Sequence, residues 1–221
     1  MVRLLRRAKD RPADPDLYAG LTHACRYCGL LSASLAATEQ ARRLDPRIRT
    51  SGAHTYFMMG DYERVLDFQP EGIPYMRNLA HVMLGRSEEA LADLAQVTLA
   101  EDHRLSYYVE GLRQTVLGNR EAALTSLRKL LDIPDPEGRF YIARELARLG
   151  EHAEALEILS SCIAGGFYCL PAFARDPWLD SLRALPEFGH ILRSAEQRHR
   201  QALIAFLNAE GDRILGVAHP V

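Results

Sequence analysis

Apolar residues recur along this chain at intervals of three and four positions. From about residue 15 to residue 165, aliphatic and aromatic residues follow the i, i+3, i+4, i+7 spacing, with polar residues between them. This spacing places the apolar side chains on one face of a helix, so it predicts a series of amphipathic helices. None of these segments shows the strict alternation of apolar and polar residues that marks a half-buried strand. The pattern therefore predicts an all-α fold.

The predicted helices form pairs, and each pair carries the same short signature at its turn. The clearest pair occupies residues 106–131, where Gly118 is followed five positions later by the small residue Ala123 and then by Leu124. A turn glycine tolerates a positive φ, which other residues adopt at a cost. The signature occurs four more times, at Gly29/Ser34/Leu35, Gly60/Val65/Leu66, Gly85/Ala90/Leu91 and Gly150/Ala155/Leu156. Five copies predict a repeat protein built from five helical hairpins.

One interval between the signature glycines is shorter than the others. Successive glycines are 31, 25, 33 and 32 residues apart, and the short interval contains Pro70 and Gly72. Because proline and glycine end helices, the second helix of the second hairpin is expected to be cut short there.

The segment before the hairpins, residues 1–12, places arginine and lysine around a few apolar positions. Cations favour the last turn of a helix, so this segment is interpreted as the end of a preceding helix or a partial repeat. On this interpretation the chain begins part-way through a longer array, or a preceding domain was lost or removed. The hairpin array itself is assigned to residues 15–165.

The pattern changes again after the fifth hairpin, and residues 166–221 are assigned to a connector and C-terminal capping helices. The aromatic residues between Phe167 and Trp178 either cover the last hairpin or form an exposed contact patch. The pair Asp176-Pro177 is typical of a helix N-cap followed by proline at the first helical position. A longer helix is expected from Pro186 to about Asn208, ended by Gly211.

The composition of the chain argues against several classes of protein. The chain has 221 residues, 48% of them hydrophobic and 25% charged, with a formal net charge of −2, which is typical of a soluble folded protein. A nucleic-acid-binding protein would usually be basic. No apolar run approaches the roughly 18–20 residues that cross a bilayer, and the basic start has no apolar signal region after it, so a cytoplasmic location is expected. Four cysteines are too few for a disulfide scaffold.

Position by position, the hairpins resemble the tetratricopeptide repeat, a helix-turn-helix unit of about 34 residues. The matching residues are Tyr18, Thr22, Cys25, Gly29, Ser34 and Pro46 in the first hairpin, Tyr107, Gly111, Gly118, Ala123 and Leu127 in the fourth, and Ala143, Leu146, Gly150, Ala155 and Leu159 in the fifth. The resemblance covers about residues 15–165. It implies a right-handed superhelical α-solenoid of about five hairpins with a C-terminal capping helix.

The third hairpin departs from this family pattern. Pro74, Arg77 and Asn78 stand where the family has a large apolar, an apolar and a small residue, so this hairpin is expected to be distorted. The segment after residue 165 is similar to the end of tetratricopeptide arrays in bacterial signalling proteins such as serine/threonine kinases. This likeness implies a bacterial sensory or regulatory setting. The chain itself carries no glycine-rich phosphate loop, kinase catalytic loop or Walker lysine.

In the family, the first helices of the hairpins line a concave groove that binds peptides. A non-catalytic module without cofactor or metal, binding a partner protein or peptide in that groove, is therefore expected. Aromatic side chains would anchor the partner and arginines would bind its carboxylates. The resemblance places these residues in the groove: His23, Arg26, Tyr27, His54, Phe57, Tyr75, Tyr108, Leu112, Phe140, Arg144 and Arg148.

Two alternatives remain open at this stage. Cys25 and Cys28, with His23, could form half of a metal or redox site, but the other half would be Cys162 or Cys169, more than a hundred residues away. A repeat-type RNA binder is the second alternative, because basic runs occur near both ends of the chain. The sequence does not decide the oligomeric state.

Overall fold

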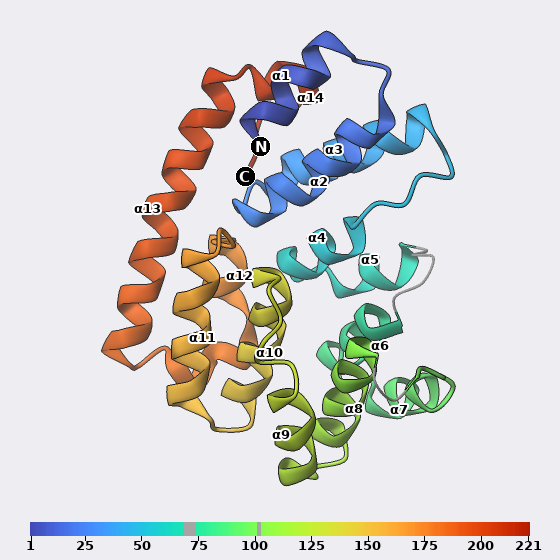
Figure 1. The fold of residues 1–221 in the computed structure, drawn as a ribbon, viewed down its shortest axis with the longest axis vertical. Helices are drawn as coiled ribbons and strands as arrows, with labels where there is room; N and C mark the ends of the chain where they lie inside the picture. Colours follow the sequence, from blue (N-terminus) through green and yellow to red (C-terminus); the bar gives the residue numbers. More distant parts are fainter. Residues whose placement is uncertain (69–73, 101–102) are drawn as a thin grey trace.

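In the computed structural model, residues 1–68, 74–100 and 103–221 are described, and these residues form helices and connecting turns only. The predicted all-α fold is confirmed (Figure 1). The helices are α1 (Val2–Asp10), α2 (Pro15–Tyr27), α3 (Leu31–Leu44), α4 (Gly52–Met59), α5 (Tyr62–Asp67), α6 (Pro74–Met83), α7 (Ser87–Ala95), α8 (Arg104–Val116), α9 (Arg120–Arg128), α10 (Pro136–Arg148), α11 (His152–Ala164), α12 (Leu170–Arg175), the 3-10 helix η1 (Pro177–Leu182), α13 (Pro186–Asn208) and α14 (Gly211–Leu215).

Consecutive helices from α2 to α11 pack as five antiparallel pairs, as the repeated signature predicts. The glycine of every signature has a left-handed backbone conformation, with φ between 75° and 86°. Any residue with a Cβ would be strained in that conformation, which explains the choice of glycine at these turns. The small residue five positions later is at most 1% exposed in all five pairs. The signature therefore combines a turn requirement with a close-packing requirement.

Three helices begin with the same capping sequence, an aspartate followed by proline. The side chains of Asp14, Asp135 and Asp176 each accept a hydrogen bond from a backbone N–H in the first turn of α2, α10 and η1. The proline fills the first helical position, where no N–H partner is needed. The prediction made for Asp176 is confirmed, although the helix it begins is a short 3-10 helix.

The second hairpin is shortened as expected. Its second helix, α5, has only six residues and ends at Asp67, whereas Pro70 and Gly72, on which the prediction relied, lie outside the described residues. In the third hairpin, α6 runs unbroken through Arg77 and Asn78, so the expected distortion does not interrupt this helix.

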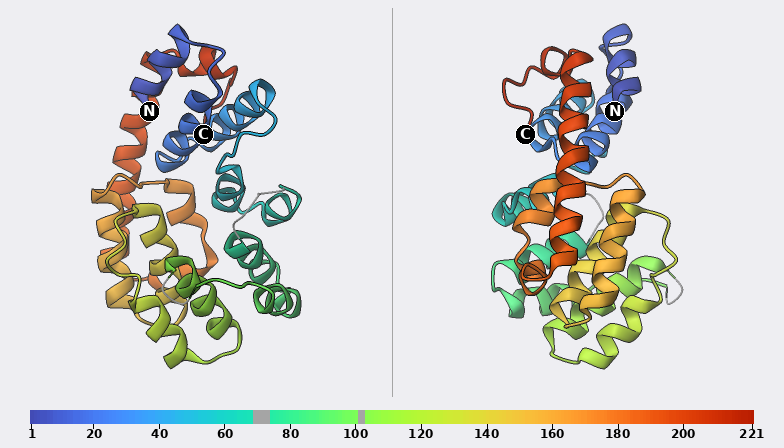
Figure 2. Two further views of the ribbon diagram at one scale, coloured as in Figure 1. Left: turned by 45° about the vertical axis from the view of Figure 1, so that its right-hand side comes forward. Right: turned by 90° about the vertical axis from the view of Figure 1, so that its left-hand side faces the viewer.

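After α11 the chain turns back toward its beginning. Helix α12 contacts α4, η1 contacts α10, and the long helix α13 packs on α11 and α12. Helix α14 then contacts both α1 and α3, so the two ends of the chain lie close together (Figure 1). Figure 2 shows α13 running along one edge of the molecule from the fifth hairpin to the first. The C-terminal segment thus closes the array on its first hairpin.

The predicted bounds of α13 are confirmed, but the explanation given for Gly211 was wrong. The left-handed residue at this helix end is Glu210, with φ 56°, and Gly211 is the first residue of α14. A Cβ on Gly211 would lie 2.5 Å from Cε2 of Phe206. Glycine is needed there because the Phe206 ring packs directly against the backbone.

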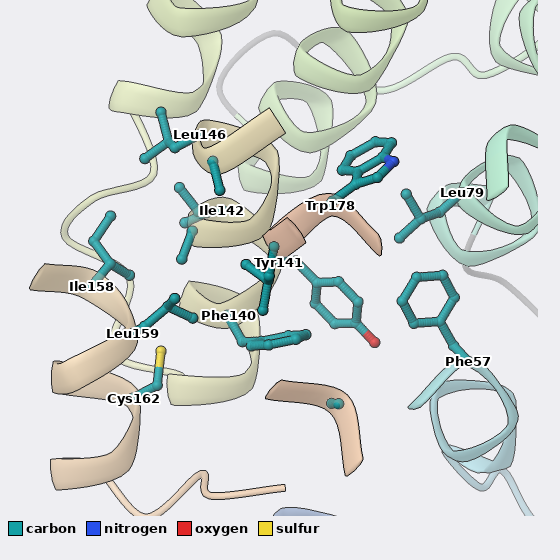
Figure 3. Packing of buried hydrophobic residues seen from close by; sticks show 14 of the residues in the cluster. Phe57, Leu79, Phe140, Tyr141, Ile142, Leu146, Ile158, Leu159, Cys162 and Trp178 are labelled. Atoms are coloured by element: carbon teal, nitrogen blue, oxygen red, sulfur yellow. The ribbon is translucent and has the colours of Figure 1, made fainter. Parts of the chain in front are cut away.

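The buried apolar residues form two clusters. The larger one surrounds α10 and joins α4 to α13. Figure 3 shows Phe140 and Ile142 of α10 between side chains of α11 on one side and Phe57, Leu79 and Trp178 on the other. The smaller cluster holds α1 and the first hairpin together with the ends of α13 and α14. Within the described ranges, no helix combines the length and the apolar character that crossing a bilayer requires.

Candidate functional site

Helix α10 lies in the interior of the molecule, on the side where the groove was expected. Ten of its thirteen residues are buried, and they are distributed around its whole circumference. A helix that is buried on all sides is enclosed by other elements of the protein. The surface that the first helices of the hairpins would present to a partner is therefore covered in large part by the chain itself.

The predicted partner-binding residues divide according to exposure. Arg148 lies at the end of α10, where it is exposed like His23, whereas Tyr27 and His54 are half-buried. The structure brings His23, Arg26, Tyr27 and His54 together beside the start of α10. The remaining predicted residues are less than 9% exposed: Arg26, Phe57, Tyr75, Tyr108, Leu112, Phe140 and Arg144. In this conformation a partner cannot reach these seven side chains, and partner binding by the groove stays a prediction.

The innermost of these contacts is a buried ion pair between Arg26 of α2 and Glu137 of α10. Nε and Nη2 of Arg26 each lie 2.7 Å from a different carboxylate oxygen, a two-point arrangement that spans 111 residues of sequence. Nη1 of Arg26 also donates to the carbonyl of Ser51 (3.0 Å) and to its Oγ (2.8 Å). Burial alone would raise the pKa of the Glu137 carboxyl, but Arg26 and His54 hold that pKa well below its usual range.

A second buried pair joins the other end of α10 to the connector before η1. The guanidinium of Arg144 donates to both carboxylate oxygens of Asp176. Its Cζ lies 4.1 Å from the ring centre of Trp178 and 5.0 Å from that of Phe57. Phe167 and Phe173 are fully buried in the same region, so the aromatic connector covers the last hairpin.

Glu145 is the one acid of α10 that lies fully buried without an ion-pair partner in the described part of the chain. Oε1 accepts a hydrogen bond from the hydroxyl of Thr115 at 2.7 Å, and Oε2 has no hydrogen-bond partner there. Burial raises the pKa of this carboxyl to about 7, although the Thr115 hydrogen bond and the charge of Arg144 oppose the rise. The charge of Glu145 in turn raises the pKa of the nearby Tyr75 and Tyr108 hydroxyls, in addition to the larger effect of their burial.

Replacing Glu145 with Gln is expected to stabilise the protein above pH 7. In the folded protein the carboxyl keeps its proton up to about pH 7, whereas in the unfolded chain it ionises near pH 4.5. Unfolding therefore releases a proton between these values, and the free energy of unfolding of the wild type falls as the pH rises through that window. The total loss is about 3 kcal/mol, and a glutamine avoids it.

Urea unfolding of both proteins between pH 4 and pH 8 measures this effect. The gap between Glu145→Gln and wild type should open between about pH 4.5 and pH 7. Glu157→Gln, which alters an exposed acid of α11, should follow the wild-type curve. Parallel curves for the wild type and Glu145→Gln would show that this carboxyl ionises normally.

The thiols of the proposed metal or redox alternative lie in the interior. All four cysteines are free and buried. Burial raises the pKa of the Cys25 thiol to about 12, which disfavours the thiolate that metals and redox partners need. The Sγ of Cys28 lies 3.4 Å from the hydroxyl of Tyr168. Among the residues the structure describes, no three His, Cys, Asp or Glu side chains are grouped so that they could hold a metal ion.

The basic residues that favour RNA as an alternative ligand are partly engaged within the chain. Lys9 Nζ lies 2.7 Å from Oε1 of Glu210, which joins α1 to the C-terminal segment. Arg198 Nη1 donates to the carbonyl of Ile163 at 2.8 Å. These contacts use cations that phosphate binding would need. RNA binding stays a prediction.

A solvent-accessible groove of about 720 Å³ lies on a different face of the fourth hairpin, between α7, α8 and α9. One stripe of α8, from Ser106 to Arg113, forms part of its lining. One wall comes from the end of α7 and the segment that follows it, and the other from the end of α9. The lining residues are Leu94, Ala95, Val97, Leu99, Ser106, Tyr107, Val109, Glu110, Arg113, Ser126 and Lys129. We refer to this feature as the α8 groove.

The lining of the α8 groove combines an apolar surface with a few charged groups. Leu94 and Val109 are buried in the wall and floor, and Val97 and Leu99 are partly exposed. Glu110 accepts hydrogen bonds from Nε and Nη2 of Arg113 at 2.9 and 2.8 Å. Apolar and polar groups contribute comparably to this lining, so the groove offers a ligand both apolar contact area and oriented polar groups.

The sequence interpretation selected a different face of α8 from the one that lines this groove. It selected Tyr108 and Leu112, which the structure buries, and treated Tyr107 as an architectural position. The groove uses Ser106, Tyr107 and Glu110, whose side chains are all partly exposed. The signal available in the sequence was the cluster of a tyrosine, an acid and an arginine on the outward face of this helix.

Three comparisons with known proteins identify no relative of this chain. A scan against protein-family models finds no match, and searches of curated proteins and of solved structures find none either.

Proposed function

We propose that this chain is a non-catalytic protein-interaction module that binds a segment of a partner protein in the α8 groove. Its five hairpins, with a left-handed glycine and a buried small residue in each, support a tetratricopeptide-like array with right-handed superhelical curvature. The likeness of its C-terminal part to bacterial signalling proteins supports a regulatory role in the bacterial cytoplasm.

The observation that carries this proposal is the size and lining of the α8 groove. Its volume of about 720 Å³ is comparable to the roughly 300–1,000 Å³ of small-molecule pockets, so it has room for a few side chains of a partner segment. The stripe from Ser106 to Arg113 covers seven helical steps, or about 10 Å at roughly 1.5 Å per residue. An extended chain advances about 3.3 Å per residue, so about three residues of a partner fit along this stripe.

A direct test is selection of binders from a displayed library of short random linear peptides, followed by affinity measurement on a blocked groove. Ala95, the last residue of α7, is exposed and lines the groove, so Ala95→Trp should fill it without disturbing the core. Selected peptides are expected to bind Ala95→Trp at least about tenfold more weakly than wild type, a change of about 1.4 kcal/mol.

The matched control is Ala122→Trp, the same substitution at an exposed position of α9 outside the groove lining. This variant should bind the selected peptides as the wild type does. The proposed function would be overturned if the library yields no binders, or if the selected peptides bind Ala95→Trp as tightly as wild type.

A further inference from the structure

The α8 groove contains one cation that no acid of the described chain neutralises. Lys129, the residue directly after α9, lines the groove, and its Nζ lies 4.9 Å from the ring centre of Tyr107. Within the described ranges it has no ion-pair partner, and the next acid along the chain, Asp132, pairs with Arg104 at 3.7 Å. Lys129 therefore presents a free positive charge at the groove.

The other charged groups of the groove balance one another. Arg113 and Glu110 form a two-point pair, and the amide Nε2 of Gln114 donates a further hydrogen bond to Glu110 at 2.7 Å. These contacts lower the pKa of the Glu110 carboxyl against the opposing effect of burial, so Glu110 is a carboxylate at neutral pH. Among the groove-lining residues that the structure describes, the charges of Arg113 and Glu110 cancel, and Lys129 contributes the remaining positive charge.

The position of Lys129 also defines where in the groove a negative group would lie. Tyr107 is the fourth residue of α8, so the cation stands near the N-terminal end of that helix. Beyond this end, along α8 toward Arg113, the lining continues with the apolar side chain of Val109.

From these observations we infer that the segment bound in the α8 groove is an extended peptide with an Asp or Glu side chain next to an apolar residue. The carboxylate pairs with Lys129, and the apolar side chain lies against Val109 and the wall formed by Val97 and Leu99. This inference rests on the proposed function, because it names the chemistry of the segment that the groove receives.

The test uses the peptides selected on the wild-type protein, made with amidated C-termini so that any carboxylate belongs to a side chain. The selected sequences should share an acid next to an apolar residue. Lys129→Glu should weaken their binding by about tenfold or more, because attraction becomes repulsion. Peptides with lysine in place of that acid should show the opposite preference and bind Lys129→Glu more tightly than wild type.

The control for this charge reversal is Arg193→Glu, at an exposed position of α13 outside the groove lining. This variant should bind both the acidic peptides and their lysine-substituted forms with the same affinity as wild type. Suppose that the peptides bind Ala95→Trp more weakly than wild type but share no acid, or bind Lys129→Glu as tightly as wild type. That result would overturn the inference and leave the proposed function in place. Peptides that also bind Ala95→Trp as tightly as wild type would overturn both the inference and the proposed function.

Discussion

Replacing Arg26 with Met is expected to lower the free energy of unfolding by about 3–5 kcal/mol. The substitution leaves the Glu137 carboxylate buried, with only 5% of its side chain exposed and without the guanidinium that pairs with it. The removal of one partner of a buried pair costs far more than the pair itself contributes, because the remaining charge has lost both water and its counter-charge. Urea unfolding followed by circular dichroism gives the difference.

A double-mutant cycle separates this effect from simple loss of packing. Arg26→Met combined with Glu137→Met removes both charges and should recover most of the stability that Arg26→Met loses. Arg77→Met breaks an exposed pair with Asp93, where the side chains are 55% and 39% exposed, and should cost less than about 1 kcal/mol. A loss of that small size for Arg26→Met would contradict the buried-pair assignment.

The loss of stability caused by Arg26→Met should be smaller in acid. In the wild type the pKa of Glu137 is depressed, so its contribution to stability is present above the unfolded pKa of about 4.5 and is lost as the pH falls below it. In Arg26→Met, burial without the arginine raises the pKa of Glu137, and protonation then removes the unpaired charge. The difference between wild type and variant should therefore shrink between pH 7 and pH 4.

Replacing Phe206 with Ala is expected to destabilise the protein by about 3–5 kcal/mol. Phe206 is fully buried near the end of α13 and belongs to the cluster that contains Leu5 of α1 and Leu215 of α14. Its ring also fills the space above Gly211, where even a Cβ would be too close. Removing the ring leaves a cavity at the contact that closes the C-terminal segment on α1 and the first hairpin.

Hydrogen exchange measures whether this closure is lost locally. In Phe206→Ala the amides of α1 and α14 should exchange faster relative to those of α10, since among the described helices α1 packs mainly on α2 and α14. Leu207→Ala changes the neighbouring residue, which is 46% exposed, and should cost only a fraction of the Phe206 effect. Equal exchange of α1 in wild type and Phe206→Ala would show that the ring does not hold the two ends together.

The hairpins could be predicted because their determinants lie within a few residues of one another. Gly118 takes φ 78° and Ala123 is fully buried, as the signature requires, and the same agreement holds in all five copies. The helix from Pro186 to Asn208 was likewise predictable from its local start signal and its length. Helix-terminating glycines, N-caps and apolar spacing are short-range features, so a single sequence displays them.

The candidate site was harder to predict because exposure depends on residues distant in sequence. Arg26 and Arg144 have the spacing of inward-facing groove residues, and both are less than 2% exposed because Glu137 and Asp176 neutralise them. Tyr108 was selected as an anchor and is buried, while its neighbour Tyr107 lines the α8 groove. Helical periodicity shows which residues share a face, but not which face another helix covers.

The sequence by itself determined that this chain folds into five helical hairpins followed by a long C-terminal helix. Only the tertiary structure decided that α10 is enclosed and that Arg26 meets Glu137 across 111 residues. It also decided that a groove open to solvent forms between α7, α8 and α9. The reason is physical: turn geometry and helix capping are set by a few neighbouring residues, whereas the path of an array is the sum of small rotations at every helix contact. That sum decides which side chains face a partner and which face each other.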